Sequence, residues 1–432
     1  MSPVSTEVER LLQGDRTVAV ELATKLLKPR ADNLVERPWG GARIREFKGL
    51  GADPLGPGRP IGESFELAAD DGDAEARHHP SMIALADGSV VALPALLALH
   101  GDVLLGAAFV SRYGRRLPLL PKLLDVVELL SVQAHPRGNT EVYVILAAEP
   151  GATIRLGFNA DVDAAALAKR LAEGRRQQQR LLDLCAGGVT PETLQAELRP
   201  WLARRYAPVA ALEAILRTRL GAATRWPEVM SCLATLRAVY WETLERLNTV
   251  PVTAGQVIYN ATPTRLTAAS GQPASAEVHA LGNPEGRAVL ALEIRRPGPT
   301  FRAWDNVRFP LRDIDIDAAL AALNLKATRA EDFLVTQVEV RAGVRRSVDC
   351  EYFRLEHLQP TALLAIDVPV TEPHTLHAVR GAVSVYATDG ALVGALRCGE
   401  SALVPIGVGA YRVVADQEPA TVIKVELPPY AE

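Results

Sequence analysis

The spacing of apolar residues changes twice along the chain. Up to about residue 160, short segments such as 62–67 and 141–146 alternate polar and apolar side chains between Gly and Pro residues, which is typical of strands. Segments 163–184, 190–220 and 226–248 instead repeat apolar residues every three or four positions, which predicts helices. Strand-like segments return at Val250. The chain is therefore predicted to be mainly β with an α-helical insertion.

This order of segments also predicts the domains. Because strands precede and follow the helical block, one β domain is expected to be completed by residues 1–158 and 250–330, with residues 159–249 as the inserted helical domain. Closely spaced strands from about residue 335 predict a second β domain over 331–432, built as a small closed barrel or a sandwich.

Composition restricts the class of partner. The 432 residues include 47 basic and 51 acidic ones, for a net charge of −4, so neither nucleic acid nor a membrane is an expected partner. The four cysteines are far apart, which argues against a zinc knuckle or a disulfide framework. The N-terminal residues are acidic where a signal peptide is basic and apolar, which predicts a cytoplasmic protein. The oligomeric state stays open.

Three side chains between residues 130 and 143 have the spacing of a metal site. Gln133 and His135 are two residues apart, so they share one face of a strand, and Glu141 begins the next alternating segment after a turn. His279, in a strand beyond the helical block, is a candidate fourth ligand. A satisfied polar pair on a strand is the alternative interpretation of Gln133 and His135.

Two further residues have two interpretations each. Trp39 lies between a proline and two glycines, where it can form the wall of a pocket or pack under a loop. Lys122 is the single basic residue of an apolar stretch, and it must either meet a buried anion or extend to the surface. Residue type alone favours the surface.

The order of several motifs resembles that of type I mannose-6-phosphate isomerases, which are zinc-dependent enzymes with cupin barrels and a helical domain. The motifs are PWGG at 38–41, GESFE at 62–66, LPLLPKLLD at 117–125, LSVQAHP at 130–136, NTEVYVILAAEPGA at 139–152, EVHALG at 277–282, LALEI at 290–294 and TFRAWD at 300–305. Segments 350–358 and 399–413 extend the resemblance toward the C-terminus. It implies a cupin-type catalytic barrel and a second cupin-like barrel at the C-terminus.

The resemblance also implies a reaction and a site. The reaction interconverts mannose 6-phosphate and fructose 6-phosphate through an enediol, with one Zn²⁺ per chain and a small sugar phosphate as the partner. The implied zinc ligands are Gln133, His135, Glu141 and His279. The implied catalytic residues are Arg302, Glu293 and Lys122, and the implied substrate-binding residues are Ser131, Trp39 and Asp305. Alternatives are an isomerase or epimerase of a related sugar, or a sugar-binding cupin that keeps the metal without turnover.

The chain departs from the family pattern beside the predicted site. Asn139 occupies the place where the family commonly has a lysine, two residues before the metal-binding glutamate. Residues 295–298, of sequence RRPG, replace a polar stretch before the arginine, and one residue fewer separates Glu293 from Arg302. Arg295 or Arg296 is therefore expected to replace the missing positive charge.

Overall fold

The computed structural model describes residues 6–51, 55–56, 58–70, 72–136, 138–220, 225–261 and 276–427. None of the helices formed by these residues has both the length and the apolar character needed to cross a bilayer.

Two β-sheets pack face to face around one apolar core. Six strands form the first sheet, in the order β1-β2-β5-β12-β7-β10, and five form the second, in the order β13-β6-β11-β8-β9. Leu124 and Ile145 of the first sheet meet Leu156 and Val250 of the second in one buried cluster. The predicted mainly β architecture is confirmed. In the described part of the chain, strand pairing gives two facing sheets and no continuous ring of hydrogen bonds.

Both sheets combine strands from before and after the helical block. The first sheet contains β1 (Leu34–Gly41), β2 (Ile61–Phe65), β5 (Leu120–Val126), β7 (Glu141–Ala148), β10 (Val257–Asn260) and β12 (Val289–Arg295). The second contains β6 (Val132–Ala134), β8 (Thr153–Phe158), β9 (Leu247–Pro251), β11 (His279–Ala280) and β13 (Phe301–Trp304). This pairing supports the predicted boundaries at residues 158, 249 and 330, which stay a prediction.

The central strands of the first sheet are buried on both faces. On β12, Leu290, Leu292 and Ile294 contact the outer core, whereas Val289 and Ala291 contact the core between the sheets. Glu293 and Arg295 continue this inner face. The alternation thus separates two apolar faces, and it places the charged residues at one end of the inner face.

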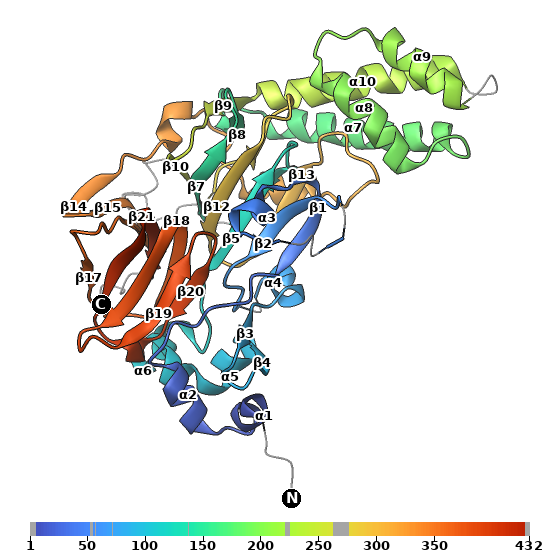
Figure 1. Cartoon of the computed structure of the whole chain (residues 1–432). Coiled ribbons are helices and arrows are strands. Elements are labelled where there is room, and N and C mark those ends of the chain that lie inside the picture. The colour runs from blue at the N-terminus through green and yellow to red at the C-terminus, as the bar shows by residue number, and fades with distance from the viewer. Residues whose placement is uncertain are drawn as a thin grey trace, which may run out of the picture.

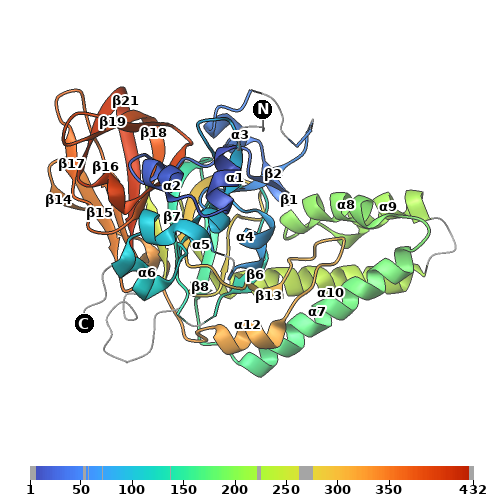
Figure 2. The same ribbon diagram turned by 90° about the horizontal axis from the view of Figure 1, so that it is seen from below.

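The helical block extends from one end of the sheets, away from the C-terminal region (Figures 1 and 2). It contains α7 (Ala164–Cys185), α8 (Pro191–Ala203), α9 (Val209–Leu220) and α10 (Trp226–Glu245). Asp163 and Thr190 cap the first turns of α7 and α8, as hydroxyl and carboxylate side chains do. Trp201 and Trp226 are buried in the core that these helices share. The segment expected to be helical over 190–220 is divided between α8 and α9.

The C-terminal region forms an eight-stranded sheet. Its path is β14-β15-β16-β21-β18-β19, with β17 on β21 and β20 on β18. The bounds are β14 (Val338–Arg341), β15 (Val344–Asp349), β16 (Arg354–Leu358), β17 (Ile366–Val368), β18 (His374–Ala387), β19 (Leu392–Arg397), β20 (Ser401–Val404) and β21 (Tyr411–Glu426).

A buried polar chain joins this sheet to the first one. His377 Nδ1 lies 2.8 Å from Ser401 Oγ, which donates to Glu66 Oε2 at 2.9 Å. The other oxygen of Glu66 pairs with Lys48 Nζ at 2.7 Å. A buried ion pair needs such additional hydrogen bonds to offset desolvation. Glu66 therefore fixes the contact between the two β regions.

Among the described residues six helices precede β5 in the chain, and most of them pack against the outer face of the first sheet. They are α1 (Glu7–Leu12), α2 (Arg16–Leu22), α3 (Arg43–Phe47), α4 (Ala74–His78), α5 (Leu93–Leu104) and α6 (Ala107–Tyr113). The remaining elements are the hairpin β3 (Met82–Ala84) and β4 (Val90–Ala92), helix α12 (Ile316–Ala322), and the 3₁₀ turns η2 (Ala330–Phe333) and η3 (Ile406–Val408).

Asp125 is a buried carboxyl whose ionisation should weaken the fold. Its Oδ2 accepts from the backbone N–H of Arg43 at 2.6 Å, and its Oδ1 has no hydrogen-bond partner in the described structure. Burial raises its pKa to about 6. Between pH 4 and 6 the unfolded chain releases this proton first, so stability should fall as pH rises through that range, by about 3 kcal/mol.

Asp125→Asn should remove this pH dependence, because an amide does not ionise and its oxygen can still accept from Arg43. Urea unfolding at pH 4.5 and pH 7.5 measures the effect. The free energy of unfolding of the variant, relative to that of the wild type, should be higher at pH 7.5 than at pH 4.5. Parallel curves of stability against pH for both proteins would contradict the prediction.

Candidate metal centre and substrate cavity

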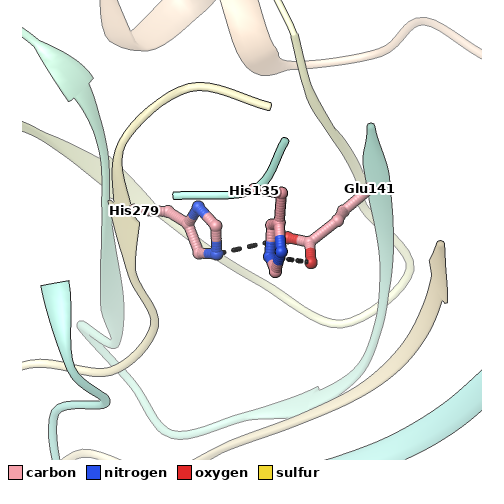
Figure 3. A group of neighbouring side chains, drawn as sticks. All are labelled: His135, Glu141 and His279. Atoms are coloured by element: carbon pink, nitrogen blue, oxygen red, sulfur yellow. Dashed lines mark ion pairs between the residues drawn. The ribbon is translucent and has the colours of Figure 1, made fainter. Parts of the chain in front are cut away.

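Three buried side chains converge between the two sheets. His135 directly follows β6, Glu141 begins β7 and His279 begins β11, and their side chains point toward one another (Figure 3). His135 Nε2 lies 2.7 Å from Glu141 Oε1, and His279 Nε2 lies 3.3 Å from Glu141 Oε2. One donor atom from each residue falls within a group no wider than 4.8 Å. Two imidazoles and a carboxylate at this separation can share one metal ion.

Backbone carbonyls orient both rings. His135 Nδ1 donates to Pro299 O at 3.1 Å, and His279 Nδ1 donates to Glu277 O at 2.9 Å. When a ring is neutral and its Nδ1 donates to a carbonyl, its lone pair is on Nε2, which faces the centre; this is the tautomer that a metal requires. His135 Nε2 is buried and makes no hydrogen bond in the described structure, although it is close to Glu141. The donor set fits a metal ion.

The ionisation states of Glu141 and His279 also suit metal binding. Burial favours the neutral acid, but His135, His279 and Arg295 hold the pKa of Glu141 well below its usual range. Burial lowers the pKa of His279 to about 4, despite the opposing attraction of Glu141. At neutral pH the centre therefore combines a carboxylate with a neutral imidazole, which is the protonation state of metal ligands.

Gln133 lies beside the three residues. It pairs with His279 across β6 and β11, and its Nε2 is 2.9 Å from His279 Nε2. Ser131 Oγ donates to the amide oxygen of Gln133 at 3.0 Å. The structure thus brings all four residues of the predicted ligand set together.

A row of alternating charges crosses the inner face of the first sheet. Arg37 on β1 pairs with Glu63 on β2 at 2.6 Å, and Lys122 on β5 lies 3.6 Å from Glu63. Lys122 also lies 3.1 Å from Glu293 on β12. The preference for a surface position of Lys122 is wrong, because its strand position points inward between two carboxylates.

Glu293 is the member of this row with an unusual pKa. Burial raises its pKa to about 7; Lys122 opposes this shift, and the negative charge of Glu141 adds to it. Glu63, which is equally enclosed, behaves differently: burial acts to raise its pKa, but Lys122 and Arg37 together lower it. Glu293 is therefore the carboxyl of the row that exchanges a proton near neutral pH.

The row lines one cavity of about 240 Å³ together with His135 and Glu141 of the metal centre. Ser131, Gln133, His135, Glu141, Trp39, Lys122, Glu293 and Arg302 are predicted site residues that line it. The polar lining residues that were not predicted are Arg37, Glu63, Thr300 and Arg312. Arg37 directly precedes the PWGG motif and Glu63 belongs to GESFE, and the strand face that Glu63 shares with Phe65 was the available signal.

Asp305 lies behind the cavity wall. Its carboxylate accepts from Arg308 Nη1 at 2.9 Å and from Arg312 Nε at 2.7 Å, and Arg312 lines the cavity. Arg302 donates from Nη1 to the carbonyl oxygen of Asp313 at 2.8 Å. Asp305 thus does not line the cavity itself but holds Arg312, which does.

The departures from the family pattern have clear positions. Asn139 is buried and donates from Nδ2 to the carbonyl oxygen of Arg296 at 3.1 Å. The Arg296 guanidinium lies over the ring of Tyr352, 5.0 Å from its centroid. Arg295 instead lies among carboxylates, with Nε 3.4 Å from Glu293 and 4.0 Å from Glu141. Of these two arginines, Arg295 is therefore the one whose positive charge lies near the carboxylates of the site.

The two facing sheets and the His–Glu–His centre define a mainly β protein with a candidate metal site beside a charged cavity. Residues 33–151 match the family model described as phosphomannose isomerase type I, catalytic domain, which confirms the sequence resemblance over that segment. No curated protein gives a significant sequence match to the chain.

Solved structures extend the likeness over nearly the whole chain. Mannose 6-phosphate isomerase from Bacillus subtilis is 18% identical with a TM-score of 0.61, covering 93% of this chain and 99% of that one. A putative mannosephosphate isomerase from Archaeoglobus fulgidus is 17% identical with a TM-score of 0.57, covering 94% and 98%. A variant of phosphomannose isomerase from Salmonella typhimurium is 18% identical with a TM-score of 0.58, covering 93% and 99%. These likenesses show a shared fold.

Proposed function

We propose that the protein is a metal-dependent aldose–ketose isomerase that interconverts mannose 6-phosphate and fructose 6-phosphate. The observation that supports this function best is the buried His–Glu–His centre at the wall of a cavity with four cationic side chains and three carboxylates. Such a cavity can accept a dianionic phosphate and still keep a carboxylate for proton transfer. The family match of residues 33–151 agrees with it.

We propose Zn²⁺ as the metal, one per chain, held by His135, His279 and Glu141. Gln133 is the proposed fourth ligand, through its amide oxygen once the amide, whose nitrogen faces His279 in this structure, turns over. Nitrogen and oxygen donors in this number suit zinc. When bound, the ion would polarise the oxygens at the reacting carbons of the sugar.

Glu293 is the proposed proton carrier. Isomerisation moves a proton between C1 and C2, so one group can remove the proton from one carbon and return it to the other. A carboxyl with a pKa near 7 is suited to both steps at neutral pH. Lys122, 3.1 Å away, holds the carboxylate in place.

The remaining lining residues would bind the substrate and stabilise its charge. Arg302 is the proposed catalytic arginine, because a fixed guanidinium can stabilise the negative charge of the enediolate. Arg37 and Arg312 are anchored by Glu63 and Asp305, so their guanidinium groups are pre-positioned for a phosphate. Trp39 and Ser131 complete the wall.

A coupled assay with mannose 6-phosphate, before and after treatment with a chelator, tests the function. Turnover should be lost on chelation and restored by added Zn²⁺. No turnover in the zinc-loaded protein would refute the proposal. Turnover of another sugar phosphate would then identify a related isomerase, and thermal stabilisation by mannose 6-phosphate without product would identify a sugar-binding protein.

A further inference from the structure

Arg295 fastens the turn that follows β12. Its side chain is buried, and Nη1 donates to the carbonyl oxygens of Arg296 and Gly298 at 3.0 and 3.1 Å. The guanidinium therefore holds the backbone of the turn 296–299 so that both carbonyl oxygens face Arg295 Nη1. A planar group with several donors in fixed directions is suited to this geometry.

Asp73 holds the same turn from the other side. Its Oδ2 accepts from Arg295 Nη2 at 2.7 Å and from the backbone N–H of Gly298 at 3.2 Å. Its Oδ1 accepts from the backbone N–H of Ala76 at 3.0 Å, at the start of α4. One carboxylate thus connects Arg295, the turn and a helix. We call this arrangement of Arg295, Asp73 and residues 296–299 the Arg295 clamp.

Asn139 packs against the clamp. Its Nδ2 donates to the carbonyl oxygen of Arg296, the same oxygen that accepts from Arg295. The Asn139 amide also lies so close to Gly298 that a side chain at that position would be only 3.1 Å from Nδ2 at its Cβ. The turn is therefore fixed by side chains from three separate segments of the chain, including the segment between His135 and Glu141.

The clamp contacts the candidate metal centre at two points. The carbonyl oxygen of Pro299, the last residue of the turn, accepts from His135 Nδ1 at 3.1 Å. Arg295 also faces Glu141 across the pairing of β12 with β7, with Nε 4.0 Å from Glu141 Oε1. The clamp thus determines where the acceptor of His135 lies and places a positive charge behind Glu141.

We infer that Arg295 and Asp73 are positioning residues that set the orientation of the metal ligands His135 and Glu141. This inference rests on the metal centre of the proposed function. Neither residue lines the cavity, so they act through the ligands and not on the substrate. Loss of a group that orients a metal ligand commonly weakens metal affinity by 10- to 100-fold.

Cobalt titration of the metal-free protein tests the inference, because the visible absorption of Co²⁺ reports on ligand geometry independently of activity. Asp73→Asn and Arg295→Lys should each weaken Co²⁺ affinity about 10-fold or more and alter the spectrum. Arg295→Lys keeps the positive charge but cannot hold both carbonyls. Glu66→Gln is the matched control, since the Lys48–Glu66 pair is similarly buried but lies outside the cavity.

Wild-type affinity and spectrum in both clamp variants, with far-UV circular dichroism confirming their fold, would overturn the inference. An equal loss in Glu66→Gln would also overturn it, because any buried ion pair would then have the same effect. Wild-type protein that binds no Co²⁺ would instead refute the metal centre itself, which distinguishes failure of the proposed function from failure of the clamp.

Discussion

Glu141→Gln is expected to abolish metal binding and turnover together. The amide keeps the shape of the side chain but removes the negative charge that faces both imidazoles, at 2.7 and 3.3 Å from their Nε2 atoms. Without that charge, metal affinity should fall more than about 100-fold, which exceeds the loss typical of a residue that only orients a ligand. Metal analysis of the purified variant and the isomerase assay measure the two effects.

Glu66→Gln again provides the control, because it makes the same change at a buried carboxylate outside the cavity. It should keep one metal ion per chain and normal turnover. If Glu141→Gln retained its metal and lost only activity, Glu141 would be a catalytic group and not a ligand.

Arg302→Ala should produce the opposite combination, a loss of turnover with the metal retained. Arg302 lines the cavity but is not among the residues that form the His–Glu–His centre. A fixed positive charge at a developing oxyanion contributes about 100- to 1,000-fold to kcat, so a decrease of that size is expected. Single-substrate kinetics with parallel metal analysis give the comparison.

Arg302→Lys separates charge from shape, because it keeps a cation without the planar donor group. It should recover part of kcat. Metal loss in Arg302→Ala would show that Arg302 supports the centre and is not a catalytic residue.

The periodic segments were predictable because local spacing determines them. The helices between 163 and 248 followed from apolar residues every three or four positions, and their capping residues Asp163 and Thr190 are local as well. The closeness of Gln133, His135 and Glu141 followed from strand alternation across one turn. His279 was assigned to the same centre because strands continue after the helical block.

The charge row was not predictable from spacing, because each of its contacts joins different strands. Lys122 illustrates this, since its environment depends on the register that places it opposite Glu293 on β12 and Phe65 on β2. Residue type alone favoured the surface. Arg295 gave a partial signal, because it is two residues from Glu293 and must share its face, but the sequence does not reveal that Asp73 approaches from the far side.

The position of β12 has a consequence for synthesis of the protein. This strand lies between β5 and β7, yet it is made after both of them and after the whole helical block. Until it leaves the ribosome, β5 and β7 each lack a neighbour along a buried edge, and unpaired edges of this kind promote aggregation. A nascent chain that ends within α10 also lacks His279. Metal capture and completion of the sheet therefore cannot precede synthesis of β12, and chaperones that shield strand edges should contact the chain before that point.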